Sequence, residues 1–131
     1  MPEGKPYTHL NLEEAKDMAA GFGHGEMGEV RFPNHDLNTQ QTGLSHHRLR
    51  PGARQPFGHR HQEAEEVYVV LAGSGRVKLD DEIRKIGRLD AIRVAPEVTR
   101  NFEASDEGLE LLAFGPRYEG DGELLHGWWN D

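Results

Sequence analysis

The sequence predicts an all-β fold, either a sandwich or a barrel, for most of its 131 residues. Short apolar segments recur about every ten residues, and turn-forming glycine, proline and aspartate residues separate them, which is typical of such folds. Side chains in a strand alternate between its two faces, so each segment can bury one face against a common core. We expect strands at residues 28–32, 42–50, 56–60, 65–72, 75–80, 83–86, 90–95, 99–104 and 109–115. The turns are expected at Pro51-Gly52, Gly73-Ser74-Gly75, Asp80-Asp81, Gly87, Pro96-Glu97 and Glu107-Gly108.

One short helix is expected before the first strand. Asn11 is a suitable N-cap, residues 12–20 carry an apolar stripe at helical spacing, and Gly21 would end the helix. We predict a single domain over residues 1–131, which we divide into three parts. These parts are a lead-in with the helix (1–27), the strands (28–116) and a C-terminal tail that contains two tryptophans (117–131).

The composition favours a protein that handles a small molecule. The chain has 23 acidic residues against 15 Lys and Arg and a formal net charge of −8, which argues against nucleic acid or an anionic membrane as a partner. It has no cysteine, so any metal must be held by nitrogen and oxygen ligands. No apolar run approaches the ~20 residues that a membrane span requires. Because the first residues also lack the apolar stretch of a signal peptide, we expect a cytoplasmic location.

Two histidines and a glutamate form the most informative pattern in the chain. His59 and His61 alternate along one predicted strand, so their side chains share a face, and Glu66 begins the apolar run of the next strand. Imidazole favours transition metals, so this set predicts a site for Fe, Mn, Ni, Co or Zn rather than for Ca or Mg. Three such ligands suffice for a catalytic zinc or for an iron site with open positions. In the alternative interpretation the histidines hydrogen-bond to Glu66 and no metal is bound.

This pattern resembles the first conserved motif of the cupin superfamily, which runs from a glycine through His-x-His and a glutamate to a second glycine. Here the two glycines are Gly52 and Gly73, and Glu66 has the spacing to Gly73 that the motif requires. The resemblance spans residues 42–115. It implies a jelly-roll β-barrel, also called a double-stranded β-helix, with the two histidines and the glutamate as metal ligands.

The second half of the chain departs from the cupin pattern. The second motif of the family runs Gly-Asp, an apolar strand, Pro-x-Gly, and then a histidine that completes a four-ligand site. Residues 87–102 align with this motif, but Glu97 stands at the turn glycine and Arg100 at the histidine. An arginine stays protonated and cannot ligate a metal, so the resemblance transfers only three ligands.

Arg100 has two interpretations. On the inward face of its strand, it would neutralise Glu66 or bind an anionic ligand such as a carboxylate through its bidentate guanidinium. At the rim it would pair with Glu97, three residues earlier. We predict the inward position. The residues predicted to contact substrate are Arg100, Tyr68, His47 and Phe102.

The strand before the first motif must also contribute a histidine to the interior. His46 and His47 lie on opposite faces of it, and each shares its face with a leucine, so the pattern does not choose between them. The inward histidine would extend the polar lining or supply a replacement ligand.

The sequence is compatible with three kinds of function. In the first, the chain is a metal-dependent enzyme of dioxygenase, isomerase or epimerase type, and no feature selects the reaction. In the second, it is a metal-free binding or sensing module in which Arg100 replaces the charge of the metal. In the third, it acts through an interface. A homodimer is expected, because the resemblance implies it and two-fold symmetry is the commonest form. Trp128 and Trp129 would cover a sheet face, fill the subunit interface or close the barrel mouth.

Overall fold

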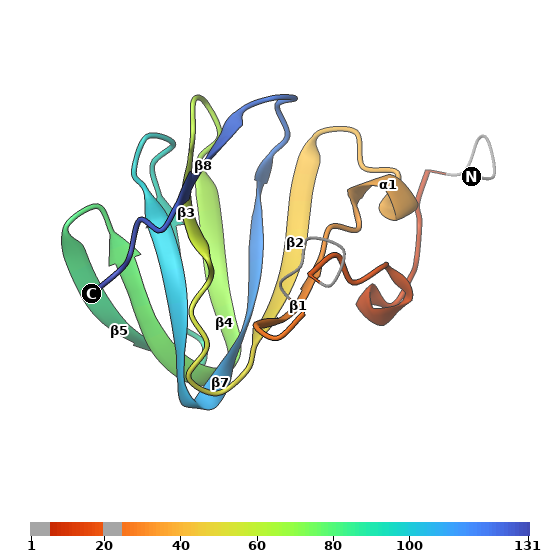
Figure 1. Ribbon diagram of the computed structural model, residues 1–131. Coiled ribbons are helices and arrows are strands. Elements are labelled where there is room, and N and C mark those ends of the chain that lie inside the picture. Colours follow the sequence, from red (N-terminus) through yellow and green to blue (C-terminus); the bar gives the residue numbers. More distant parts are fainter. Residues whose placement is uncertain (1–5, 20–24) are drawn as a thin grey trace.

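The computed structural model describes residues 6–19 and 25–131, in which an antiparallel sheet curls into a barrel (Figure 1). The strands are β1 (Gly28–Arg31), β2 (Thr42–Leu49), β3 (Phe57–His61), β4 (Glu66–Leu79), β5 (Glu82–Gly87), β6 (Ala91–Val94), β7 (Arg100–Pro116) and β8 (Gly122–His126). The described residues also form a 3-10 turn, η1 (Leu12–Glu14), and a one-turn helix, α1 (Asn34–Leu37). The all-β fold expected from the sequence is confirmed.

The two longest strands join the layers of the barrel. Neighbouring strands follow the order β1-β2-β7-β3-β8, and β4 pairs with β5, β6 and β7. The second half of β7 pairs with β2, while its first residue, Arg100, lies opposite His59 of β3. As a result, β3 and the start of β4 face each other across the same end of the barrel.

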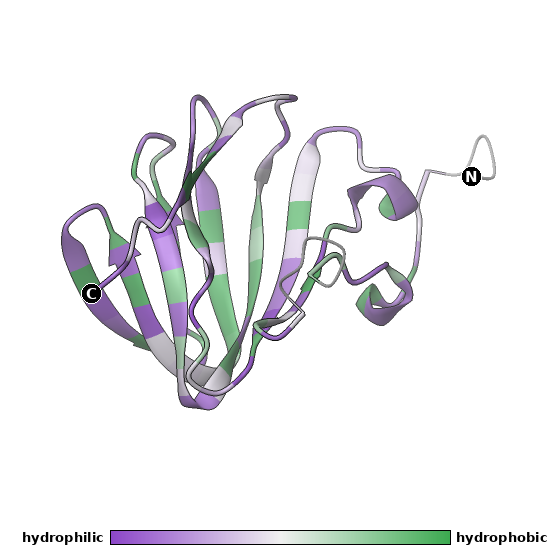
Figure 2. Cartoon of the chain, viewed as in Figure 1, coloured by the Kyte–Doolittle hydropathy of each residue, from purple (hydrophilic) through white to green (hydrophobic). Residues whose placement is uncertain are grey.

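Alternating apolar side chains fill the space between the layers. Val70, Val77 and Phe102 are fully buried, and Tyr68 and Leu111 are nearly so. Figure 2 shows hydrophobic residues alternating with polar ones along the strands, as a sheet with one buried face requires.

Glycines let β4 and β7 cross closely where the sequence suggested a turn. Segments 65–72 and 75–80 form one strand, so the turn predicted at Gly73-Ser74-Gly75 is wrong. The pairing with β7 instead shifts register between Gly73 and Gly75, as at a β-bulge. A Cβ on Gly75 would lie 2.0 Å from the carbonyl oxygen of Glu103, so only glycine fits there. Segments 99–104 and 109–115 likewise join into β7.

The N-terminal helix is shorter than expected. Asn11 caps it as predicted, because its side-chain oxygen accepts the N–H of Glu13 at 2.9 Å, but the helical turn ends at Glu14. The Asp17 carboxylate accepts the backbone N–H of Val30 at 3.0 Å and draws the following segment against β1. The predicted end of the helix at residues 20–21 lies outside the described residues. No helix in residues 6–19 or 25–131 is long and apolar enough to cross a membrane.

The C-terminal tail contains a strand that the sequence analysis did not predict. β8 pairs with β3 from Phe57 opposite His126 to His61 opposite Gly122. It follows a loop after β7 and lies at the edge of the sheet, so the segment runs beside the strand that carries the two motif histidines.

The two tryptophans cover a sheet face. Trp128 packs on Gly58, on the side of β3 opposite to His59, and a Cβ on Gly58 would lie 2.8 Å from the indole ring. Trp129 is buried, and the Arg54 guanidinium lies 4.2 Å from the centre of its ring. Of the three roles expected for this pair, the structure shows the first: within one chain, both tryptophans cover a face of the sheet.

Candidate metal centre

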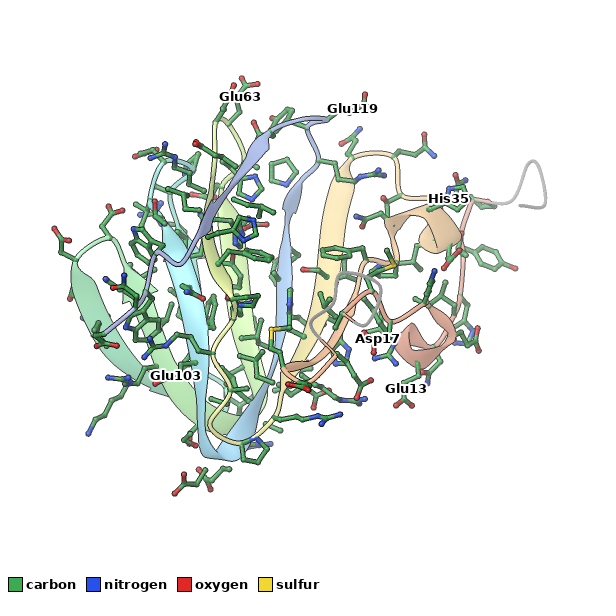
Figure 3. All side chains as sticks on the ribbon, viewed as in Figure 1. Glu13, Asp17, His35, Glu63, Glu103 and Glu119 are labelled. Carbon is green, nitrogen blue, oxygen red and sulfur yellow. The ribbon has the colours of Figure 1, made fainter. Side chains whose placement is uncertain are left out.

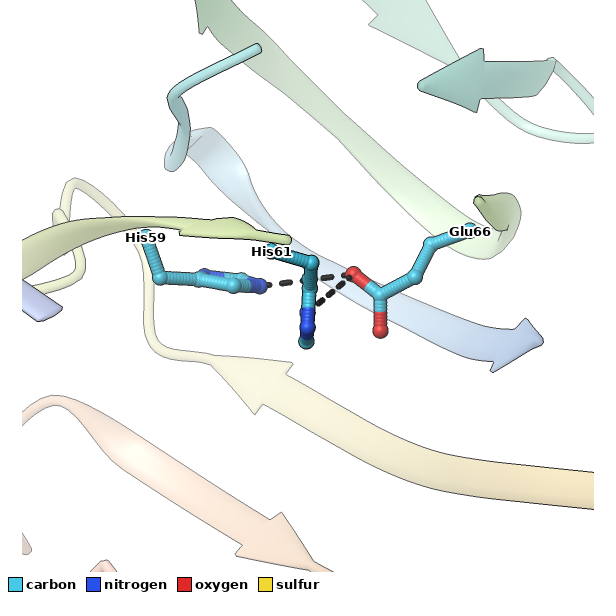
Figure 4. Close-up of side chains that lie close together, drawn as sticks. All are labelled: His59, His61 and Glu66. Atoms are coloured by element: carbon cyan, nitrogen blue, oxygen red, sulfur yellow. Dashed lines mark hydrogen bonds and ion pairs between the residues drawn. The ribbon is translucent and has the colours of Figure 1, made fainter. Parts of the chain in front are cut away.

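The three predicted metal ligands meet at one end of the barrel. β3 carries His59 and His61, and Glu66 opens β4 opposite them (Figure 4). Nε2 of His59 lies 3.4 Å and Nε2 of His61 lies 3.3 Å from Oε1 of Glu66. One ligand atom from each residue lies within 4.8 Å of the others, so the group could hold a metal ion.

Glu66 is held in its charged form. Burial alone would raise the pKa of its carboxyl, but the contacts with His59 and His61 and the hydrogen bond from Tyr68 outweigh burial and hold that pKa well below its ordinary value. The Tyr68 hydroxyl donates to Oε1 at 2.6 Å. Burial raises the pKa of Tyr68, which therefore stays a donor. The carboxylate is thus present in the form that ligates metals.

Burial favours the neutral form of His59. Burial lowers the pKa of its imidazole, and the hydrogen bond with Glu66 only partly opposes this. A neutral imidazole has one nitrogen lone pair free for a metal. The His59 and His61 rings stand nearly perpendicular, with their centres 5.4 Å apart.

Asp121, which the sequence analysis did not single out, holds His61 from the side away from Glu66. Its Oδ2 lies 3.2 Å from Nδ1 of His61, and its two oxygens accept the backbone N–H groups of Glu63 and Ala64 at 2.9 and 3.0 Å. Burial tends to raise the pKa of Asp121, but these backbone hydrogen bonds and His61 lower it overall, so the carboxylate is ionised. No spacing rule could have found this contact, because 60 residues separate the two in sequence.

The contact with Asp121 selects which nitrogen of His61 faces the centre. An ionised Asp121 accepts the proton on Nδ1, which leaves Nε2 as the atom directed at Glu66. Nε2 is buried and makes no hydrogen bond to the described residues. Its contact with Glu66 raises the pKa of His61, so a metal would compete there with a proton.

Arg100 points inward, as predicted, rather than to the rim with Glu97. Its side chain is fully buried, with Nη1 3.9 Å from Oε1 of Glu66 and Nη2 donating to the Ala95 carbonyl at 3.1 Å. Nε and Nη1 find no hydrogen-bond partner among the described residues. Phe102 is also fully buried, and its ring centre lies 4.8 Å from that of Tyr68. Both side chains therefore lie behind the ligand group, not on an open surface.

The two histidines of β2 lie on opposite faces of the strand, and His46 is buried, at 3% exposed, although it lies on the face opposite to Leu49. His46 bonds to Glu110 at 2.6 Å, while His47 bonds to Ser45 at 2.8 Å on the face it shares with the buried Leu49. Burial, and then repulsion from His59, lower the pKa of His47 to about 4. Neither histidine joins the group of candidate ligands in the described residues, so no replacement for the fourth ligand appears.

A cleft of about 510 Å³ opens onto the ligand group. His61 and Glu66 line its base, and the exposed Phe32, Arg117 and Tyr118 line its rim. Figure 3 shows the loops that carry Glu63 and Glu119 projecting at this end of the barrel. The volume suits a small molecule.

Sequence comparison with protein families gives one match. The cupin domain family matches residues 45–115, which is more than half of the chain. This chain belongs to the cupin family. Among curated proteins, none matches the sequence of this cupin.

Solved structures with the same fold cover nearly the whole cupin. A cupin protein from Bacteroides fragilis is 22% identical, with a TM-score of 0.71 and 88% of each chain covered. A sugar phosphate isomerase from Silicibacter pomeroyi is 15% identical, with a TM-score of 0.68, covering 91% of this chain and 92% of its own. An oxalate decarboxylase from Lactobacillus farciminis, in complex with formate, is 25% identical with a TM-score of 0.72. The cupin covers 38% of that longer chain, and 92% of this cupin is matched.

The residues present in this cupin fit a three-ligand metal site. Two imidazole nitrogens and an ionised carboxylate converge, and the buried Nε2 of His61 is directed at Glu66 without a hydrogen bond. Arg100 adds a buried positive charge 3.9 Å from Glu66, behind the three candidate ligands.

Proposed function

We propose that this cupin binds a small molecule in its cleft, on a divalent transition metal held by His59, His61 and Glu66. The observation that carries the proposal is the convergence of three donor atoms within 4.8 Å, one of which, Nε2 of His61, is buried without a hydrogen bond. Fe, Mn, Ni, Co and Zn all suit this donor set. When bound, the metal would act as a Lewis acid toward an oxygen of the ligand.

The charges behind the site favour an anionic ligand. Arg100 is buried 3.9 Å from the Glu66 carboxylate, and a divalent metal would add two further positive charges beside it. At about 4 Å and an effective dielectric constant of 20, two unit charges interact by about 4 kcal/mol, so the guanidinium and the metal would repel strongly. An anion bound to the metal would offset both.

The chain's own residues prepare the site. Tyr68 holds the Glu66 carboxylate through a 2.6 Å hydrogen bond, and Asp121 fixes the tautomer of His61. The similarity to the solved structures shows the fold alone, so the reaction, whether of dioxygenase, isomerase or epimerase type, is left open.

A metal-free binding module is the second candidate, and one observation favours it. The buried Arg100 already compensates the charge of Glu66, so the barrel can hold that carboxylate without a metal. In that case the ligand would be bound by hydrogen bonds and apolar contacts in the cleft.

Elemental analysis by mass spectrometry separates the two candidates. We expect about one transition metal per chain in protein purified without a polyhistidine tag, and almost none in the Glu66→Gln variant, which keeps the shape of the side chain but loses the charged ligand. His35→Ala, which removes an exposed histidine of α1, is the matched control and should keep the metal. A metal content near zero in the wild type, unchanged after incubation with each metal, would reject the metal-bound form and favour the second candidate.

A further inference from the structure

Arg117, whose side chain is fixed by hydrogen bonds, lies at the rim of the cleft. Arg117 follows the end of β7, and its side chain lies across Gly43 of β2, where a Cβ would come within 3.0 Å of Arg117 Cγ. Nη1 donates to the hydroxyl and the carbonyl oxygen of Thr39 at 3.1 and 3.4 Å, and the backbone N–H donates to Gln41 at 2.9 Å. Residues 39–43 thus fix the guanidinium at the rim, although the side chain is exposed.

The positive charge of Arg117 has no counterpart within the protein as described. Arg60, Arg76 and Arg93 form ion pairs with glutamates, whereas no ion pair in residues 6–19 and 25–131 includes Arg117. Its side-chain hydrogen bonds use Nη1 alone, which leaves the N–H groups of Nε and Nη2. That pair of donors forms the fork that binds a carboxylate through two parallel hydrogen bonds.

The cleft that Arg117 lines also contains the candidate metal ligands and several apolar residues in its lining. His61 and Glu66 line its base, while Leu44, Ala64 and Ala113 contribute apolar surface to its lining. A molecule that fills the cleft would therefore contact both the candidate metal ligands and a guanidinium that forms no ion pair among the described residues.

We propose that Arg117 selects the ligand, which carries a carboxylate for the guanidinium at the rim and an oxygen donor for the metal at the base, joined by a short apolar body. The inference rests on the proposed function, because the contact at the base is the proposed metal. Arg100 does not make the rim contact, since it is fully buried and does not line the cleft.

Calorimetric titration of metal-loaded protein with small dicarboxylates tests this inference. Succinate, glutarate and adipate are compared with their monoamides, which keep the size but lose one charge. We expect the best dicarboxylate to bind about tenfold more tightly than its monoamide, as charge-assisted hydrogen bonds at a partly exposed site allow. Arg117→Gln should abolish this preference, and Arg117→Lys should restore part of it. The control is Arg88→Gln, because Arg88 is also exposed and lies outside the cleft.

The outcomes separate the inference from the proposed function. Metal-loaded protein that binds no dicarboxylate, or that keeps its preference in Arg117→Gln, would overturn the role of Arg117 and leave the metal site standing. An equal loss in Arg88→Gln would overturn it too, because the effect would then be one of general charge. Protein that takes up no metal yet loses its dicarboxylate preference only with Arg117→Gln would support the rim contact and reject the metal.

Discussion

His61 contacts two carboxylates, Glu66 and Asp121, which are far apart from each other in the sequence. Glu66 lies 3.3 Å from its Nε2, and Asp121 holds its Nδ1 at 3.2 Å. One contact supplies a neighbouring ligand, and the other sets the tautomer and the orientation of the ring. A substitution at Asp121 would therefore act on the centre through His61, without contact to the metal itself.

From the lowered pKa of His47 we predict how the free energy of unfolding depends on pH. Burial lowers its pKa from 6.5 to about 4, so below pH 6.5 the unfolded chain takes up a proton that the folded protein refuses. The stability linked to this neutral imidazole is complete above pH 6.5 and is lost as the pH falls towards 4. We expect His47→Gln to reduce this loss, measured as the free energy of urea unfolding of metal-free protein between pH 7 and pH 4.

The control for this prediction removes an exposed histidine. His35→Gln lies on α1, outside the barrel interior, and the pH dependence of its stability should follow the wild type. If His47→Gln and wild-type protein lose the same free energy over this pH range, the burial of a neutral His47 is not the cause.

At the scale of elements, the C-terminal segment and β3 are matched in shape. Gly58 leaves room for the indole of Trp128, and the Lys78 ammonium lies 4.6 Å from the centre of the same ring. The ammonium group over the ring face adds a cation–π contact to the packing. The segment is therefore fixed to β3 by side-chain packing as well as by the pairing of β8.

Gly58→Ala tests this packing. The new Cβ would lie 2.8 Å from Cε3 of Trp128 and 3.1 Å from Cγ2 of Thr99, so we expect a loss of about 1–3 kcal/mol in the free energy of unfolding, typical of overpacking. In a Trp128→Ala background the same substitution should cost less than half as much, because the closest contact is gone. Equal costs in the two backgrounds of this double-mutant cycle would show that Gly58 is not there to accommodate Trp128.

At the scale of the whole molecule, the barrel brings together residues from β2, β3, β4 and the loop after β7. The candidate ligands come from β3 and β4, and most of the other residues that line the cleft come from residues 32–45 and 113–121. A molecule bound in the cleft would therefore contact segments that are distant in sequence. The homodimer, the cytoplasmic location and the single-domain organisation stay predictions.

Metal binding should stabilise the entire fold. A ligand that binds only the folded state stabilises it by about 2.7 kcal/mol at 100 times its Kd. Protein stripped with a chelator should therefore melt at a higher temperature when the preferred metal is restored, and Glu66→Gln should show no such shift. A rise of the same size in Glu66→Gln would mean that the metal binds elsewhere.

The sequence predicted those features that depend on local order. Alternation placed His59 and His61 on one face and Arg100 inward, because a strand has a fixed period of two. The same rule could not choose between His46 and His47, since the choice depends on which leucine the neighbouring strands bury. Asp121 and the crossing at Gly75 depend on contacts across the sheet. Local patterns cannot show such contacts.

The edge position of β8 has a consequence for the kinetics of the centre. Among the described residues β8 pairs only with β3, and most of its side chains are exposed, so it should detach more often than the interior strands. An opening that extends to Asp121 would free the His61 ring while the rest of the barrel stays folded. The lifetime of a bound metal would then be set by how often this edge strand opens locally, rather than by global unfolding. Amide hydrogen exchange in β8 should accordingly be faster than in β7 and should slow when metal is added, whereas equal protection of the two strands would contradict this view.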